Sequence, residues 1–138
     1  MKNYELFEHT ADTGVRVKAK DLKGVFINSA FALFNIIAEK KAEARTNAQK
    51  INLKQKAQNR EELFFNWLSE LLSLSAAKGL IFTDFKIIDL KDDSLEALAE
   101  GASANGFIML TEVKAVTYHN LKIEKIGFLW QAEFILDV

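Results

Sequence analysis

Cysteine and proline are both absent from this 138-residue sequence, and glycine occurs only six times. Without cysteine the chain has no disulfide bonds, thiol nucleophiles or thiolate zinc ligands, which is typical of a protein in a reducing compartment. No run approaches the roughly 18 apolar residues of a membrane-spanning helix. The acidic N-terminal segment lacks the pattern of a signal or transit peptide. These absences predict a soluble, cytoplasmic protein that does not associate with membranes.

A strong charge of either sign is also missing. Eighteen basic residues stand against nineteen acidic ones, which gives a formal net charge of -1. A protein that holds a nucleic-acid backbone over a large surface is usually basic. Any role with RNA is therefore expected to be local or indirect.

Two amphipathic helices are the clearest elements in the pattern. Hydrophobic residues recur at three- and four-residue spacing after Asp21, which can cap the first helix. Asn59 and Glu62 form a capping-box pattern before the second helix, and Gly79 marks its C-terminal end. With 49% hydrophobic residues, the chain can bury one core, so a single domain over residues 1–138 is expected.

Alternating apolar and polar residues predict strands in the rest of the chain. These strands are expected over 15–20, 51–53, 81–90, 95–99, 112–123 and 128–136. Hairpin turns are predicted at 91–94 and at 125–127, and a polar connector over 39–50. In the last strand Phe128 is predicted to share the buried face with Trp130 and Phe134. The fold class is α+β, with two amphipathic helices packed on a mainly antiparallel β-sheet.

Familiar catalytic motifs are missing. The sequence has no phosphate-binding glycine loop, dinucleotide fingerprint, GxSxG elbow or HExxH motif. The two histidines, His9 and His119, have no evident nucleophile beside them, so neither indicates covalent catalysis.

Strand pairing suggests where acidic groups meet. A hairpin that turns at 125–127 places Asp137 opposite a position between Lys114 and Val116. If the strand after Asp12 pairs antiparallel with the last strand, Asp12 lies beside Asp137, and the α-carboxylate of Val138 adds a third anionic group. Crowded carboxylates require a cation or a raised pKa. Oxygen ligands suit Ca²⁺, Mg²⁺ or Mn²⁺.

A simpler interpretation of the same residues stays open at this point. Asp12 can cap a turn at Thr13 and Gly14, and Asp137 can form an exposed ion pair with Lys114. In that case no metal site exists.

Four blocks of the sequence resemble the archease family. They are EHTADTG at 8–14, NWLSELL at 66–72, EVKAVTYH at 112–119 and FILDV at 134–138. Each is weak alone, but together and in this order they span nearly the whole chain. The run after Gly101, residues 102–107, departs from the family, which commonly has an acidic residue and later a histidine there.

The resemblance implies an accessory protein rather than an enzyme. Archeases are partners of RtcB-class RNA ligases, which use GTP and Mn²⁺ in tRNA splicing and RNA repair. The family would promote guanylylation and multiple turnover of the ligase and would contact RNA only through it. The carried-over metal ligands are Asp12, Asp137 and Val138, with Ca²⁺ the first choice and Mg²⁺ or Mn²⁺ as alternatives. Lys114 and His9 would line that site.

Two other classes of function compete with this one. A metal-dependent hydrolase or phosphotransferase uses carboxylates, a cation and a lysine, which here would be Asp12 and Asp137, the bound ion and Lys114. The apolar helix faces suggest a general chaperone, although they also suit an ordinary core.

Overall fold

The computed structural model describes residues 3–9, 12–42 and 47–138, with only the main chain described at Glu8 and His9. The elements are β1 (Tyr4–His9), β2 (Asp12–Ala19), α1 (Leu22–Ile37), β3 (Ala38–Lys40), β4 (Gln49–Lys56), α2 (Arg60–Lys78), β5 (Leu80–Leu90), β6 (Ser94–Ser103), the 3₁₀ turn η1 (Ala104–Gly106), β7 (Phe107–Met109), β8 (Ala115–Ile126) and β9 (Leu129–Asp137).

Helix α1 begins and ends where local chemistry dictates. The Asp21 carboxylate accepts a hydrogen bond from the backbone N–H of Gly24 at 2.7 Å, so it satisfies a free donor of the first turn. The helix ends when Ala38 adopts an extended conformation. The apolar face is buried as predicted, with Val25, Phe26 and Leu33 fully inaccessible to solvent.

The structure confirms the predicted start and end of helix α2. The Asn59 side chain accepts a hydrogen bond from the N–H of Glu62 at 2.9 Å. Gly79 has a φ of 63°, a left-handed conformation that favours glycine, and its N–H donates to the carbonyl of Ser75. In the described part of the chain, neither helix combines the length and the apolar character needed to cross a membrane.

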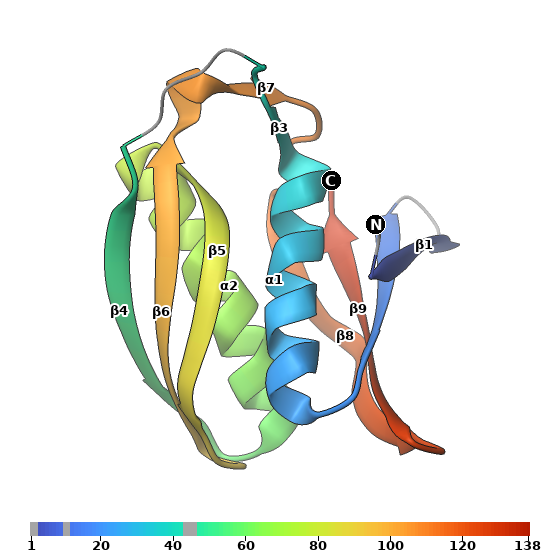
Figure 1. Ribbon diagram of the computed structural model, residues 1–138. Helices are drawn as coiled ribbons and strands as arrows, with labels where there is room; N and C mark the ends of the chain where they lie inside the picture. The colour runs from blue at the N-terminus through green and yellow to red at the C-terminus, as the bar shows by residue number, and fades with distance from the viewer. Residues whose placement is uncertain (1–2, 10–11, 43–46) are drawn as a thin grey trace.

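The strands form three antiparallel sheets rather than the one expected. A four-stranded sheet has the order β1-β2-β9-β8, a three-stranded sheet the order β4-β6-β5, and β3 pairs with β7. Figure 1 shows both helices between the two larger sheets. Helix α1 contacts β2 on one side and β5 on the other, and α2 contacts β8 and β5. Each helix therefore buries apolar surface on two sides, which the periodicity of a single stripe did not indicate.

The core between the sheets is rich in aromatic residues. Trp67 of α2 is fully buried, packs edge-on against Phe85, and donates its indole N–H to the carbonyl of Phe26 at 2.9 Å. Phe64 contacts Phe26 on α1 and Phe134 on β9, also edge-on. These contacts join both helices to both large sheets because one α2 face reaches all of them.

Three details of the strands differ from the sequence prediction. The last hairpin turns at Gly127 and Phe128, since Ile126 pairs with Leu129, and Phe128 is 96% exposed rather than buried. Strand β1 was not predicted as a strand. The connector over 39–50 is partly strand, because β3 extends to Lys40 and β4 begins at Gln49, while 43–46 lie outside the described residues.

A bulge in β8 restores the predicted pairing of β8 with β9, although the hairpin turn itself is displaced. Near the turn the observed pairing is offset by three residues from the predicted one. The four residues 118–121 then lie between the pairs Thr117–Ile135 and Lys122–Glu133, opposite Phe134 alone. Asn120 in this bulge has a φ of 59°. The bulge removes the offset, so Asp137 pairs with Ala115, as expected.

Candidate metal centre

The four-stranded sheet brings the two predicted aspartates together at one end. The predicted antiparallel pairing of the first and last strands is present, with Thr13 opposite Leu136. Asp12 and Asp137 are the next residues beyond this pair on the two strands. On the outer strands, His9 pairs with Asp12 and Ala115 with Asp137. The main chain of all four residues therefore lies in one row across the sheet, which we call the aspartate row.

Lys114 reaches this row through its backbone. Its N–H donates to the carbonyl of Asp137 at 2.7 Å, and its side chain is exposed. No ion pair within 4.0 Å joins Lys114 to Asp137 in the described part of the chain. The alternative in which Asp12 caps a turn is wrong, because Thr13 and Gly14 lie within β2.

The chemistry of the donors fits a hard cation. The side chains of Asp12 and Asp137 are neither buried nor fully exposed, and no lysine or arginine of the described residues pairs with them. Carboxylate oxygens are ligands for Ca²⁺, Mg²⁺ and Mn²⁺. Among the side chains that the structure describes, those of residues 3–7, 12–42 and 47–138, no cluster of three or more His, Asp or Glu is suited to a metal. Two carboxylates would thus need a further donor, such as the carboxyl group of Val138.

Gly14 of β2 lets a neighbouring strand come close to the two aspartates. A Cβ atom at Gly14 would lie 2.2 Å from the ring of Phe7, so the ring lies directly over the glycine. Gly14 pairs with Phe7 on one side and with Ile135 on the other. The absence of a side chain lets Phe7 of β1 cover β2, next to the aspartate row. A glycine at an outward position of an alternating strand was the signal for this close approach.

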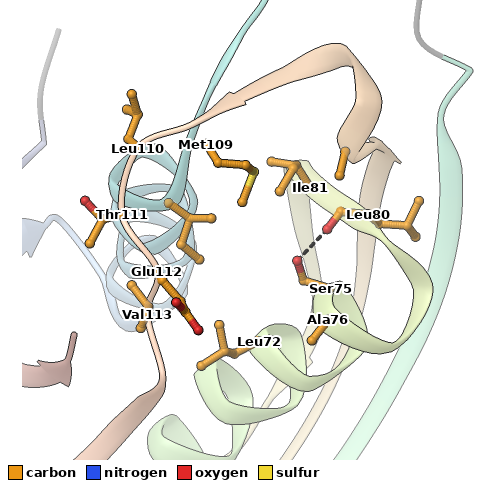
Figure 2. Close-up of a pocket in the computed structure, with 12 residues that line it drawn as sticks. Leu72, Ser75, Ala76, Leu80, Ile81, Met109, Leu110, Thr111, Glu112 and Val113 are labelled. Carbon is orange, nitrogen blue, oxygen red and sulfur yellow. Dashed lines mark hydrogen bonds between the residues drawn. The ribbon is translucent and has the colours of Figure 1, made fainter.

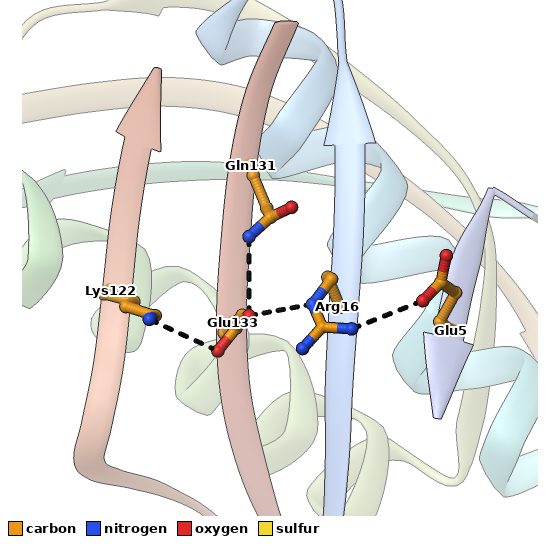
Figure 3. Close-up of polar contacts among 5 residues, drawn as sticks. All are labelled: Glu5, Arg16, Lys122, Gln131 and Glu133. Atoms are coloured by element: carbon orange, nitrogen blue, oxygen red, sulfur yellow. Dashed lines mark hydrogen bonds and ion pairs between the residues drawn. The ribbon is translucent and has the colours of Figure 1, made fainter. Parts of the chain in front are cut away.

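The same face carries a chain of ion pairs farther along the strands (Figure 3). Arg16 donates from Nε to Glu133 at 2.7 Å and lies 3.3 Å from a Glu5 oxygen, while Lys122 lies 3.7 Å from Glu133. The hydrogen bond to Glu133 is the main reason why the pKa of Arg16 is raised above its ordinary value. The stabilisation that depends on the guanidinium proton is therefore complete below the ordinary pKa of arginine and is lost as the pH rises through the raised pKa. Here charges alternate, whereas no lysine or arginine that the structure describes pairs with Asp12 or Asp137.

Replacement of Glu133 by glutamine is expected to lower the free energy of unfolding by about 1 kcal/mol. The carboxylate is only 17% exposed and pairs with both Arg16 and Lys122, so its loss removes two attractions. Urea unfolding at low and high salt measures the change, and the loss should shrink at high salt. Glu124→Gln, at an exposed position of β8, is the control. An equal loss in both variants would contradict the role given to the ion-pair chain.

The second histidine does not belong to the aspartate row. His119 lies in the bulge of β8 and is exposed. The side chain of His9 lies outside the described part, so its predicted role as a lining residue stays a prediction. The stretch 10–11 of the opening motif lies outside the described residues as well.

The comparisons with known proteins agree along the whole chain. The model of the Archease protein family matches residues 4–138. The chain is 34% identical to protein archease of Methanosarcina barkeri, over 99% of this chain and 97% of that protein. It is also 34% identical to protein archease of Pyrococcus furiosus, with complete coverage of both chains.

Solved structures share the fold. The solution structure of protein 1598 of Methanobacterium thermoautotrophicum has a TM-score of 0.77, is 32% identical and is covered completely, as is this chain. The crystal structure of an archease, possible chaperone, from Thermotoga maritima has a TM-score of 0.65 and 19% identity, covering 96% of this chain and 94% of that one. The chain belongs to the archease protein family.

Proposed function

We propose that this protein activates an RtcB-class RNA ligase that acts in tRNA splicing and RNA repair. It would promote guanylylation of the ligase and its multiple turnover, and would contact RNA only through the ligase, in the cytoplasm. The observation that supports this role best is the convergence of Asp12 and Asp137 at the end of the four-stranded sheet. Both residues lie in motif blocks that resemble the archease family.

The proposed site holds one hard divalent cation. Asp12, Asp137 and the carboxyl group of Val138 are the proposed ligands, with Ca²⁺ the first choice and Mg²⁺ or Mn²⁺ as alternatives. Lys114 and His9 are proposed to line the site and to act on the ligase. A bound cation would supply positive charge between the carboxylates. The protein residues position those carboxylates through the antiparallel register and through the hydrogen bond from Lys114 to Asp137.

A chaperone role is the second candidate, since the related Thermotoga maritima protein is described as a possible chaperone. The helix faces themselves do not favour a general chaperone, because their large apolar residues are buried between the sheets. A general chaperone would suppress aggregation of unrelated proteins, and Asp12→Ala would not change that activity. An effect restricted to the ligase favours the activator.

A metal-dependent hydrolase or phosphotransferase uses similar groups. It also needs substrate-binding groups around the metal, and no phosphate-binding glycine loop is present in the sequence. Turnover of nucleotides or phosphoesters by the purified protein alone would favour this class over an accessory role.

The decisive experiment measures guanylylation of the cognate ligase at limiting Mn²⁺ and GTP, with and without this protein. We expect the protein to accelerate the reaction and to allow more than one round of ligation per ligase molecule. Absence of acceleration by a folded protein would overturn the proposal. The unfolding transition of the same preparation shows whether the protein is folded.

A further inference from the structure

A segment made of η1, β7 and the irregular residues 110–114 crosses one end of the molecule, and we call it the strap, residues 104–114. Besides the β3–β7 pairing, five main-chain hydrogen bonds join it to other segments: Ala104 N–H to Gly79, Lys41 N–H to Gly106, the N–H groups of Leu110 and Thr111 to Ile37, and Lys114 N–H to Asp137. The strap therefore spans from the end of α2 to the end of α1. These backbone contacts and the buried side chains of Phe107 and Val113 fix its position.

The strap borders an open cavity of about 350 Å³ with a mostly apolar lining. Figure 2 shows the strap residues 109–113 on one side and α2 with the start of β5 on the other. Leu72 and Ala76 of α2, Ile81 of β5 and Val113 contribute apolar surface. The volume is within the usual range for binding pockets and exceeds that of one or two side chains. The cavity is therefore large enough for a leucine-, methionine- or phenylalanine-sized group.

Three consecutive large apolar residues of the strap face solvent beside this cavity. Ile108 is 50% exposed, Met109 58% and Leu110 54%. Met109 and Leu110 also line the cavity, so the exposed apolar surface continues into it. An extended apolar surface of this kind is typical of a protein–protein contact, and the flexible methionine side chain adapts to a partner. It extends beyond what a small ligand inside the cavity would cover.

The charge around the cavity selects the partner. Glu112 is the one charged residue among the described residues that line it, and no lysine or arginine of the described part pairs with Glu112. The cavity also touches the C-terminal ends of both helices, at Ile37 of α1 and Ser75 of α2. Helix C-termini carry partial negative charge; the last turn of α1 has no basic residue, whereas that of α2 contains Lys78. The site is thus apolar, with the Glu112 carboxylate as the one charged group among the described residues that line it.

We propose that the cavity and the strap dock a segment of the partner ligase that inserts an aliphatic or aromatic side chain. A neighbouring lysine or arginine of that segment would pair with Glu112. This inference rests on the proposed function, since it places the ligase on this surface. The strap ends at Lys114, whose N–H bonds to the carbonyl of Asp137, so the docked segment lies along the chain that leads to the aspartate row. Docking there brings the ligase to the carboxylates.

The test fills the cavity from outside. Ala76 is exposed on α2 and lines the cavity, so Ala76→Trp obstructs it at little cost to the core. Ala77→Trp, one position along the helix, adds the same side chain at an exposed site that does not line the cavity. With ligase and nucleotide fixed, we expect Ala76→Trp to raise the concentration for half-maximal guanylylation about ten-fold, with the maximal rate kept. The Ala77→Trp control should match the native protein.

Charge reversal tests the rim. Glu112→Lys should weaken direct binding of the ligase about ten-fold, measured by titration calorimetry, and the loss should diminish as salt is raised. Glu124→Lys on β8 makes the same change of net charge away from the cavity and should have no such effect. Native-like activation and binding by Ala76→Trp and Glu112→Lys would overturn the docking site while leaving the activator function intact. Absence of activation by the native protein would instead overturn the function.

Self-association is the remaining outcome. If sedimentation shows that the native protein forms a dimer, and Ala76→Trp but not Ala77→Trp dissociates it, the surface binds a second copy of this chain. That result would overturn the ligase as occupant. A monomeric native protein with the expected shifts supports it.

Discussion

Replacement of Trp67 by alanine is expected to lower the free energy of unfolding by about 4 kcal/mol. The side chain is fully buried in α2 and contacts the ring of Phe85 edge-on. Truncation leaves a cavity between the two large sheets and also leaves the Phe26 carbonyl without its indole donor. Urea or guanidinium unfolding followed by circular dichroism measures the change in midpoint at constant slope.

Two further variants separate the packing from the hydrogen bond. Trp67→Phe keeps much of the ring contact but removes the N–H donor, so a loss of about 1–3 kcal/mol is expected. Trp130→Ala removes a second tryptophan that is only half-buried on β9, where the Arg60 guanidinium lies 5.1 Å from the ring centroid. Its cost should be clearly smaller than that of Trp67→Ala. Similar losses for both alanine variants would contradict the central place of Trp67 in the core.

Replacement of Asp137 by asparagine is expected to reduce the acceleration of ligase guanylylation by at least about ten-fold. The substitution preserves size but removes one of the two adjacent carboxylates, so both cation affinity and activation should fall. The backbone hydrogen bond from Lys114 to Asp137 does not involve the side chain, so the fold should persist. Calcium titration by calorimetry and the guanylylation assay provide two separate measurements.

A matched control and a second variant make this prediction specific. Asp93→Asn makes the same change in the exposed β5–β6 turn, at the opposite end of the molecule from the C-terminus (Figure 1), and should act as native. Addition of residues after Val138 moves the terminal carboxylate away. If that carboxylate is a ligand, the affinity for the cation should fall. Full activation by a folded Asp137→Asn variant would rule out the proposed metal site but would leave the activator function supported.

The helices could be predicted from the sequence because their signals are local. Asp21 and Asn59 each satisfy a free N–H three residues later, and Gly79 adopts the left-handed conformation that ends α2. Capping and periodicity act within one or two turns, so no distant contact was needed to locate these limits. The resemblance to the archease family was also evident in the sequence, and the comparisons confirm the family.

Strand pairing was predicted less completely because its determinants lie far apart. The position of Asp137 opposite Ala115 was expected from a turn at 125–127, yet the turn lies at Gly127 and Phe128. A bulge at 118–121 compensates for this shift of the turn. The pairing of Asp137 was therefore predicted correctly, although the bulge was not predicted. Neither β1 nor the division into two large sheets was predicted, since short strands have weak local patterns and gain stability from their neighbours.

The sequence by itself determined the two helices, the α+β class, the oxygen chemistry of the candidate ligands and the resemblance to the archease family. The tertiary structure decided which distant residues meet. It placed Asp12 beside Asp137 through the β2–β9 register, and it folded the strap over an apolar cavity between the ends of α1 and α2. The physical reason is that caps and helical periodicity depend on neighbours in the chain, whereas register and cavities depend on packing between segments that are far apart in the sequence.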